Sequence, residues 1–350
     1  MKKIVSLFSL LLVLLVSNNC YGEVESLKER IAQLEERVAQ LEAKIAASSE
    51  IFTPIERGHS DRMFPLGNNW YYSTSNGERD EYIEEVFAAL FSEFIRIFGE
   101  EAMSHKPVTI YNVPGAASPM AIPLGKTMRI RLVQNSTGFW AQLVYQLSHE
   151  MTHYMFFSYF PHADQGNYGE VDDKEKSSWN EEIICEAMSL YMLKYMSDNW
   201  EKCALSKINP AFNSALKEYL DNEYKRTKNL PLKSEGDAVP FGDFHARFNR
   251  TTNDLDNHIT ERNYLYDLFV STNAETIGEI GNMYKHYNKE YRYIDYASWI
   301  KAANNPDFIK KISAIQPRLS CLPSTSGFRL LQEPVTTCNV SQPSISSRTH

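Results

Sequence analysis

Two histidines at helical spacing constrain this chain more than any other feature. Residues 148–154 read SHEMTHY, so His149 and His153 are four positions apart and Glu150 follows the first of them. On an α-helix this spacing places both imidazoles on one face, one turn apart, where they can bind a single Zn²⁺ ion. Glu150 is then placed to act as a general base on a metal-bound water molecule. The alternative is a core helix that carries two unrelated histidines.

The residues around this motif predict a helix with a strand before it. Apolar side chains recur at helical spacing from Phe139 to Tyr154, which indicates a helix over about 138–158. Upstream, MRIRLVQ (128–134) alternates apolar and charged residues, as in a half-buried strand at the edge of a sheet. The chain therefore predicts a strand, a short turn and then the motif helix.

A catalytic zinc ion requires three protein ligands and one open position. Metzincin peptidases take the third ligand from a histidine shortly after the motif, preceded by a glycine. This chain has Phe156 and Tyr159 at those two positions, which excludes the metzincin pattern.

A candidate third ligand lies in WNEEIICEAMSLYML (179–193). This segment resembles the second zinc helix of gluzincin metallopeptidases, which commonly reads Trp-x-x-Glu, then a small residue and an acid. Trp179, Glu182, Cys185 and Glu186 hold those positions here. The resemblance implies that Glu182 binds Zn²⁺ and that Glu186 orients a ligand histidine. A competing register makes Glu186 the ligand. The segment is apolar almost all round, so its acids need a partner, and a metal site supplies one.

The resemblance implies an α+β fold at 52–315, a zincin-like domain with a small mixed or antiparallel sheet. Both zinc helices belong to this domain, and a mainly helical half follows them. In such domains the strand before the motif helix borders the cleft and can pair with an extended substrate. The expected elements also include a helix at 80–102, a strand at 106–115 and helical segments at 209–228 and 256–272. Residues 263–287 are expected to form a helix, a loop and another helix.

The implied activity is zinc-dependent hydrolysis of peptide bonds in a peptide or protein substrate. Zinc would lower the pKa of its bound water to near 7, and Glu150 would accept the proton. Gluzincins also use a Tyr or His of the helical half, for which His258, Tyr264 and Tyr266 are candidates. Two alternatives are hydrolysis of a cell-wall amide and a non-enzymatic exported scaffold with a degenerate zincin domain.

The N-terminus predicts export. Lys2 and Lys3 precede an apolar run at 4–16, which is typical of a signal peptide, here assigned to 1–22, and too short for a transmembrane span. We therefore expect a periplasmic or extracellular protein. The alternative is a lipoprotein anchored at Cys20, although Ser17-Asn18-Asn19 is a poor lipobox.

A heptad pattern follows the signal peptide. It predicts a parallel coiled coil at 23–48 and a homo-oligomer formed through residues 24–45, because β-branched residues alternate with leucines along the stripe. The alternative is a single amphipathic helix packed on the domain. The stripe consists of Val24, Leu27, Ile31, Leu34, Val38, Leu41 and Ile45.

The net charge and the cysteines bear on partners and on disulfides. A net charge of −8 without a basic patch argues against a nucleic-acid partner. An exported chain with an even number of remaining cysteines predicts disulfides. Three pairings are possible, and the sequence-local one joins Cys185 to Cys203 and Cys321 to Cys338. The alternative is that Cys185 is a small buried residue without a disulfide. Residues 316–350 are rich in Ser, Thr and Pro and predict an extended tail.

Overall fold

The computed structural model divides the chain into two compact units, residues 1–60 and 61–350. It describes residues 62–74, 76–116, 118–124, 127–135, 138–158, 178–225, 230–240, 244, 258–288 and 293–320. All of these belong to the second unit. The predicted signal peptide with Cys20, the heptads at 24–45, the 159–177 connection, Cys321 and Cys338 lie outside the described residues.

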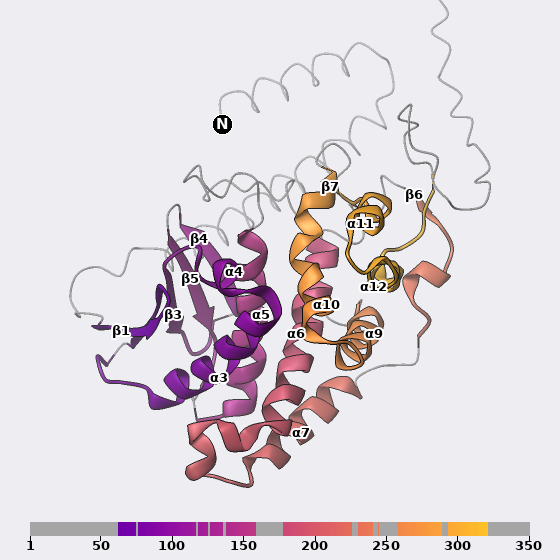
Figure 1. The fold of residues 1–350 in the computed structure, drawn as a ribbon. Coiled ribbons are helices and arrows are strands. Elements are labelled where there is room, and N and C mark those ends of the chain that lie inside the picture. Colours follow the sequence, from indigo (N-terminus) through magenta and orange to yellow (C-terminus); the bar gives the residue numbers. More distant parts are fainter. Residues whose placement is uncertain are drawn as a thin grey trace, which may run out of the picture. The chain divides into compact units, whose positions relative to one another are not determined.

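The described part of the chain is an α+β fold built on a small mixed sheet (Figure 1). The sheet has five strands in the order β1-β2-β3-β5-β4. The three inner strands β2, β3 and β5 are parallel, whereas β1 and β4 pair antiparallel at the two edges. The predicted fold class and mixed sheet are therefore confirmed. The strands are β1 (Arg62–Gly67), β2 (Trp70–Thr74), β3 (Val108–Asn112), β4 (Met120–Leu124) and β5 (Thr127–Leu132).

The first two strands form a hairpin that the sequence analysis missed. Asn68 and Asn69 connect them with φ angles of 48° and 66°, so both central turn residues are left-handed. This backbone is favourable for a two-residue hairpin turn, and asparagine tolerates it better than most residues. The hairpin places Trp70 at the centre of the core.

The expected edge strand was assigned to the wrong segment. The strand predicted at 128–134 is β5, which lies inside the sheet between β3 and β4. The edge is formed by β4, whose Pro123 has no N–H to donate to a second neighbour. The alternation of Arg129, Ile130 and Arg131 correctly marks one buried and one open sheet face. Alternation reports burial on a face, however, and not position within a sheet.

Helices α3 (Glu81–Phe98) and α5 (Trp140–Phe157) cover the apolar face of the sheet. Trp70 is fully buried between them, with its ring against Phe87 and Phe91 of α3 and Tyr154 of α5. The helix expected at 80–102 is divided at Gly99, which adopts a φ of 85° and ends α3, and the short α4 (Glu100–Ser104) follows.

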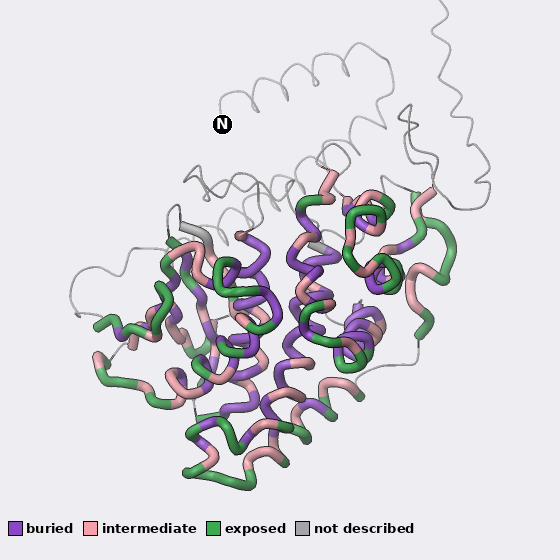
Figure 2. The backbone as a smooth tube through the Cα atoms, in the orientation of Figure 1, coloured by how far each residue is buried: buried purple, intermediate pink, exposed green. Residues whose placement is uncertain are grey.

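Helix α6 (Ser178–Asp198) packs along α5 and also contacts α7 and α9. Figure 2 shows that α5 and α6 are buried along most of their length. A helix that is apolar all round needs neighbours on every side, which α6 finds between the sheet half and the helical half. The later helices are α7 (Phe212–Tyr224), α9 (Ile259–Val270), α10 (Ala274–Gly278), α11 (Tyr296–Ala302) and α12 (Pro306–Ile312).

Short elements complete the helical half. Val239–Pro240 (β6) pairs in parallel with Leu319–Ser320 (β9), so the fold continues past the expected boundary at 315. None of the helices in the described ranges has the length and apolarity needed to cross a membrane. The remaining elements are the hairpin of β7 (Tyr287–Asn288) and β8 (Tyr293–Ile294) and the 3₁₀ helices η4 (Trp200–Lys202), η5 (Ala204–Lys207), η6 (Lys233–Glu235), η8 (Glu279–His286) and η9 (Ser313–Ile315).

Candidate metal centre

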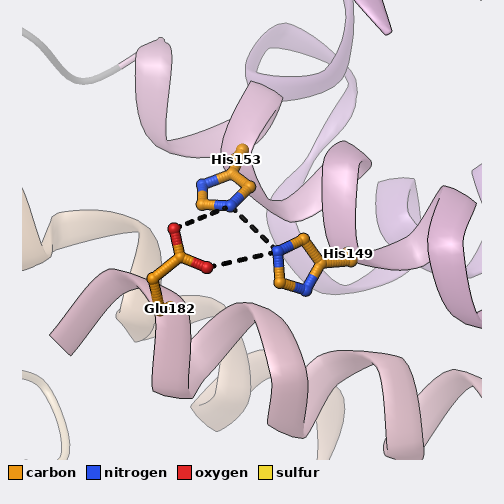
Figure 3. Close-up of side chains that lie close together, drawn as sticks. All are labelled: His149, His153 and Glu182. Carbon is orange, nitrogen blue, oxygen red and sulfur yellow. Dashed lines mark hydrogen bonds and ion pairs between the residues drawn. The ribbon is translucent and has the colours of Figure 1, made fainter. Parts of the chain in front are cut away.

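The packing of α5 on α6 brings together the three predicted ligands, His149, His153 and Glu182 (Figure 3). One potential ligand atom from each side chain lies within 4.8 Å of the other two. The two Nε2 atoms are 3.1 Å apart, and the Glu182 oxygens lie 3.4 Å from His149 Nε2 and 3.6 Å from His153 Nε2. These residues form a cluster that could hold a metal ion.

The separation of the two histidines fits a shared ion. Metal–ligand bonds of about 2.0–2.1 Å at tetrahedral angles separate neighbouring ligand atoms by about 3.4 Å. The two Nε2 atoms, 3.1 Å apart, lie close to that value, and Glu182 contacts each of them through a different carboxylate oxygen. The donor set of two imidazole nitrogens and one carboxylate oxygen is also one that zinc accepts.

The alternative register, with Glu186 as ligand, does not agree with this geometry. Glu186 Oε1 lies 3.4 Å from Nδ1 of His149, on the side of the ring that points away from the cluster. This is the position of an orienting carboxylate. Glu182 is therefore the glutamate that joins the histidines, and Glu186 contacts only the outer nitrogen of one of them.

The sequence analysis missed a further carboxylate, that of Glu181. Its Oε1 lies 2.6 Å from Nδ1 of His153, and its side chain is almost fully buried. The sequence did mark Glu181, because it is an acid in the same nearly apolar helix as Glu182, and buried acids need partners. Both ligand histidines thus have a carboxylate at Nδ1, which leaves their Nε2 lone pairs facing the cluster.

The electrostatics follow from burial and from this pairing. Burial would raise the pKa of Glu182, but the two histidines outweigh it and hold that pKa well below its ordinary value. Burial by itself would lower the pKa of His149. The hydrogen bond to Glu182 and the charges of Glu186 and Glu150 outweigh burial, so that the pKa is raised. Glu182 is thus ionised beside the two imidazoles, which suits a ligand for a cation.

Glu150 is 2% exposed and lies beside both histidines. Burial raises the pKa of its carboxyl, and the charge of Glu182 adds to this effect, while the histidines and the backbone amide of Ala121 oppose it. Its Oε2 has no hydrogen-bond partner among the described residues. Because Ala121 belongs to β4, the Glu150 carboxylate contacts this edge strand as well as lying beside the histidines.

The three candidates from the helical half lie in different places. His258, directly before α9, is 3% exposed, and its ring packs edge-on against Trp179, which precedes Glu182 by three positions on α6. Its Nε2 is buried without a partner among the described atoms. By contrast, the Tyr264 hydroxyl donates to the Lys311 carbonyl at 3.1 Å. The third, Tyr266, packs on Tyr224. Burial and the charges of nearby aspartates raise the pKa of its hydroxyl, and no residue of the cluster contributes to this shift.

The predicted disulfide between Cys185 and Cys203 is wrong, because both cysteines are free and buried. Cys185 lies in the first half of α6, whereas Cys203 follows the helix. About 20 Å of helix separates Cys185 from the end of α6, and a disulfide requires Cα atoms within about 7 Å. Cys185 instead lies against His153, and burial raises the pKa of its thiol.

The first turn of α6 is attached to the C-terminal part of the fold by side-chain hydrogen bonds. Trp179 Nε1 donates to the Ile315 carbonyl at 3.0 Å. Asn180 accepts from the Tyr296 hydroxyl at 2.8 Å and donates to Gln316 Oε1 at 3.0 Å. The turn that carries Glu181 and Glu182 is therefore held by residues more than 100 positions downstream.

Comparison of this chain with models of protein families, with curated proteins and with solved structures finds no match. The chemistry of the cluster must therefore be judged from its own residues.

Proposed function

We propose that this protein is a zinc-dependent hydrolase that cleaves peptide bonds. One observation carries the proposal, namely the convergence of His149, His153 and Glu182 next to the buried carboxylate of Glu150. A structural zinc site needs ligands but no base. Burying a carboxylate oxygen without a hydrogen-bond partner lowers the stability of the fold, so the position of Glu150 is better explained by a catalytic role.

In this proposal the two histidines and Glu182 would hold Zn²⁺. A bound Zn²⁺ would supply a water molecule of lowered pKa and a Lewis acid for a carbonyl oxygen. As the water oxygen adds to the carbonyl carbon, Glu150 would accept the proton of the water, and it would deliver that proton to the leaving nitrogen when the C–N bond breaks. The burial that raises the pKa of Glu150 brings it closer to the operating pH, which favours a group that must both accept and release a proton.

The substrate is proposed to bind in an extended form along β4. This strand has a neighbour on only one side within the described sheet, so its other edge presents backbone carbonyl groups, whereas Pro123 has no N–H and the Ala121 amide is directed to Glu150. An extended peptide can add to such an edge as a further strand. Because the Ala121 amide of β4 reaches Glu150, a peptide paired there would pass close to the base.

His258 is the candidate we assign to the reacting carbonyl oxygen. Burial lowers the pKa of its imidazole to about 4, so the ring is neutral at pH 7 and has one N–H to donate. Its unpaired buried Nε2 would gain a partner when the substrate binds. Tyr264 and Tyr266 are assigned structural roles.

Export through residues 1–22 and self-association through residues 24–45 remain part of the proposal. They rest on the sequence patterns alone, namely a basic start followed by a short apolar run and an unbroken heptad stripe.

The test is metal analysis together with peptide-library cleavage by the wild type and by Glu150→Gln. We expect about one zinc per chain in both proteins, and cleavage only in the wild type. Glu279→Gln is the matched control, since Glu279 is also buried but accepts hydrogen bonds from the backbone amides of Asn304 and Asn305. Absence of stoichiometric metal at neutral pH would refute the site, and cleavage that persists in Glu150→Gln would refute the role of the base.

A further inference from the structure

Each ligand histidine is linked through a carboxylate to a tyrosine. On one side, the Tyr145 hydroxyl donates a hydrogen bond to Glu186 Oε2. The other oxygen of Glu186 lies 3.4 Å from Nδ1 of His149. Because Tyr145 precedes His149 by one helical turn, both face α6 from the same side of α5.

The second link has the same chemistry but a different origin. The Tyr284 hydroxyl donates to Glu181 Oε2, while Glu181 Oε1 accepts from Nδ1 of His153 at 2.6 Å. Tyr284 belongs to η8 and is 103 positions away from Glu181 along the chain. The helical half thereby reaches the cluster through a buried phenol that is 3% exposed.

A phenol suits this task because it is a neutral donor. The histidine needs a carboxylate that is ionised and held at a fixed angle, since that acceptor sets the tautomer and the ring orientation. An arginine or lysine in place of the tyrosine would compete electrostatically with the imidazole for the carboxylate. A phenol occupies one carboxylate oxygen, and the other oxygen stays available to Nδ1.

We infer that Tyr145 and Tyr284 are positioning residues of the metal centre, acting on His149 through Glu186 and on His153 through Glu181. The inference rests on the proposed function, because it concerns the metal that those histidines would bind. The metal affinity of the site would then depend partly on residues that contact no ligand atom. One of them, Tyr284, belongs to the helical half.

The experiment measures zinc affinity by competition with a chromophoric chelator, and the visible spectrum of the cobalt-loaded protein, on the full chain. The variants are Tyr145→Phe, Tyr284→Phe and Tyr191→Phe. Tyr191 is the matched control, because its hydroxyl donates to a buried carboxylate, Glu93 of α3, which is not part of the site. We expect the first two variants to weaken zinc binding by about 5-fold to 10-fold each and to alter the cobalt spectrum. Tyr191→Phe should stay within about twofold of the wild type.

The outcomes separate the inference from the proposed function. A wild type without stoichiometric zinc would refute the proposed function and the inference with it. A zinc-binding wild type with three unaffected variants, or with three equally weakened ones, would refute the inference alone, since a general loosening of α6 would then explain the effect. If Tyr284→Phe fails to fold, the zinc affinity of Tyr145→Phe is compared with that of Tyr154→Phe, a second control on the same helix. The Tyr154 hydroxyl contacts the backbone of Lys106 in the described structure. Equal affinities of these two variants would refute the inference.

Discussion

Glu181 and Glu182, adjacent on α6, contact opposite sides of the same imidazole. Glu181 Oε1 lies 2.6 Å from Nδ1 of His153, and Glu182 Oε1 lies 3.6 Å from Nε2 of that ring. Consecutive helical residues point about 100° apart, so the ring of His153 must enter between them. One of these glutamates therefore faces the metal cluster, and the other holds the ring from behind.

This relationship predicts different effects for the two neighbours. Glu182→Ala should abolish stoichiometric zinc binding, because it removes a ligand. Glu181→Ala should retain zinc with an affinity lowered by about 10-fold to 100-fold, because it removes only an orienting partner. Isothermal titration with zinc measures both values. Glu201→Ala, which removes an equal charge at an exposed position on η4, should leave the affinity unchanged. Equal losses in both neighbours would contradict the assignment of the ligand.

Acid should destabilise the protein through His105. Burial lowers the pKa of its imidazole to about 4, below the ordinary value of 6.5, so the folded state favours the neutral ring. The stability that this group contributes is complete above pH 6.5 and is lost as the pH falls from 6.5 towards 4. The loss should be on the order of 2 kcal/mol after allowance for partial exposure. Urea unfolding of the metal-free protein at pH 7 and pH 4.5 measures it. A His105→Phe variant should show a smaller difference between the two pH values, and an unchanged difference would exclude His105 as the cause.

The core should depend strongly on Trp70. Its indole is fully buried against α3 and α5, and its Nε1 donates to the Met103 carbonyl at 2.7 Å. Trp70→Ala should lower the free energy of unfolding by about 3–5 kcal/mol, through the cavity and the unpaired carbonyl. Met63→Ala, on the open face of the same sheet at 52% exposure, should change it by less than about 0.5 kcal/mol. Chemical denaturation followed by circular dichroism compares the two, and similar losses would show that the sheet faces are assigned incorrectly.

Both Cys185 and Cys203 should behave as protected thiols. A thiol reagent should label neither in the folded protein, because both are buried, and should label both after unfolding without reductant. Peptide mass spectrometry after labelling identifies the two sites. Detection of a Cys185–Cys203 cross-linked peptide in the unreduced protein would contradict the structure.

Local patterns in the sequence determined the helices that carry the site. The apolar periodicity from Phe139 to Tyr154 predicted the helix that carries His149 and His153, and the apolar surroundings of Glu182 predicted that its own helix is buried. Both expectations follow from a 3.6-residue period that is set by nearby residues. The choice of Glu182 over Glu186 also agrees with the cluster that the structure forms.

Only the tertiary structure decided what lies next to these helices. Strand order placed β4 and not β5 at the edge, and packing brought Glu181 to His153 and Tyr284 to Glu181 over 103 positions. Packing likewise kept Cys185 and Cys203 apart, although they are close in sequence. Periodicity states which face of an element is buried, but the partner that covers this face depends on how distant segments share one core, which local spacing does not encode.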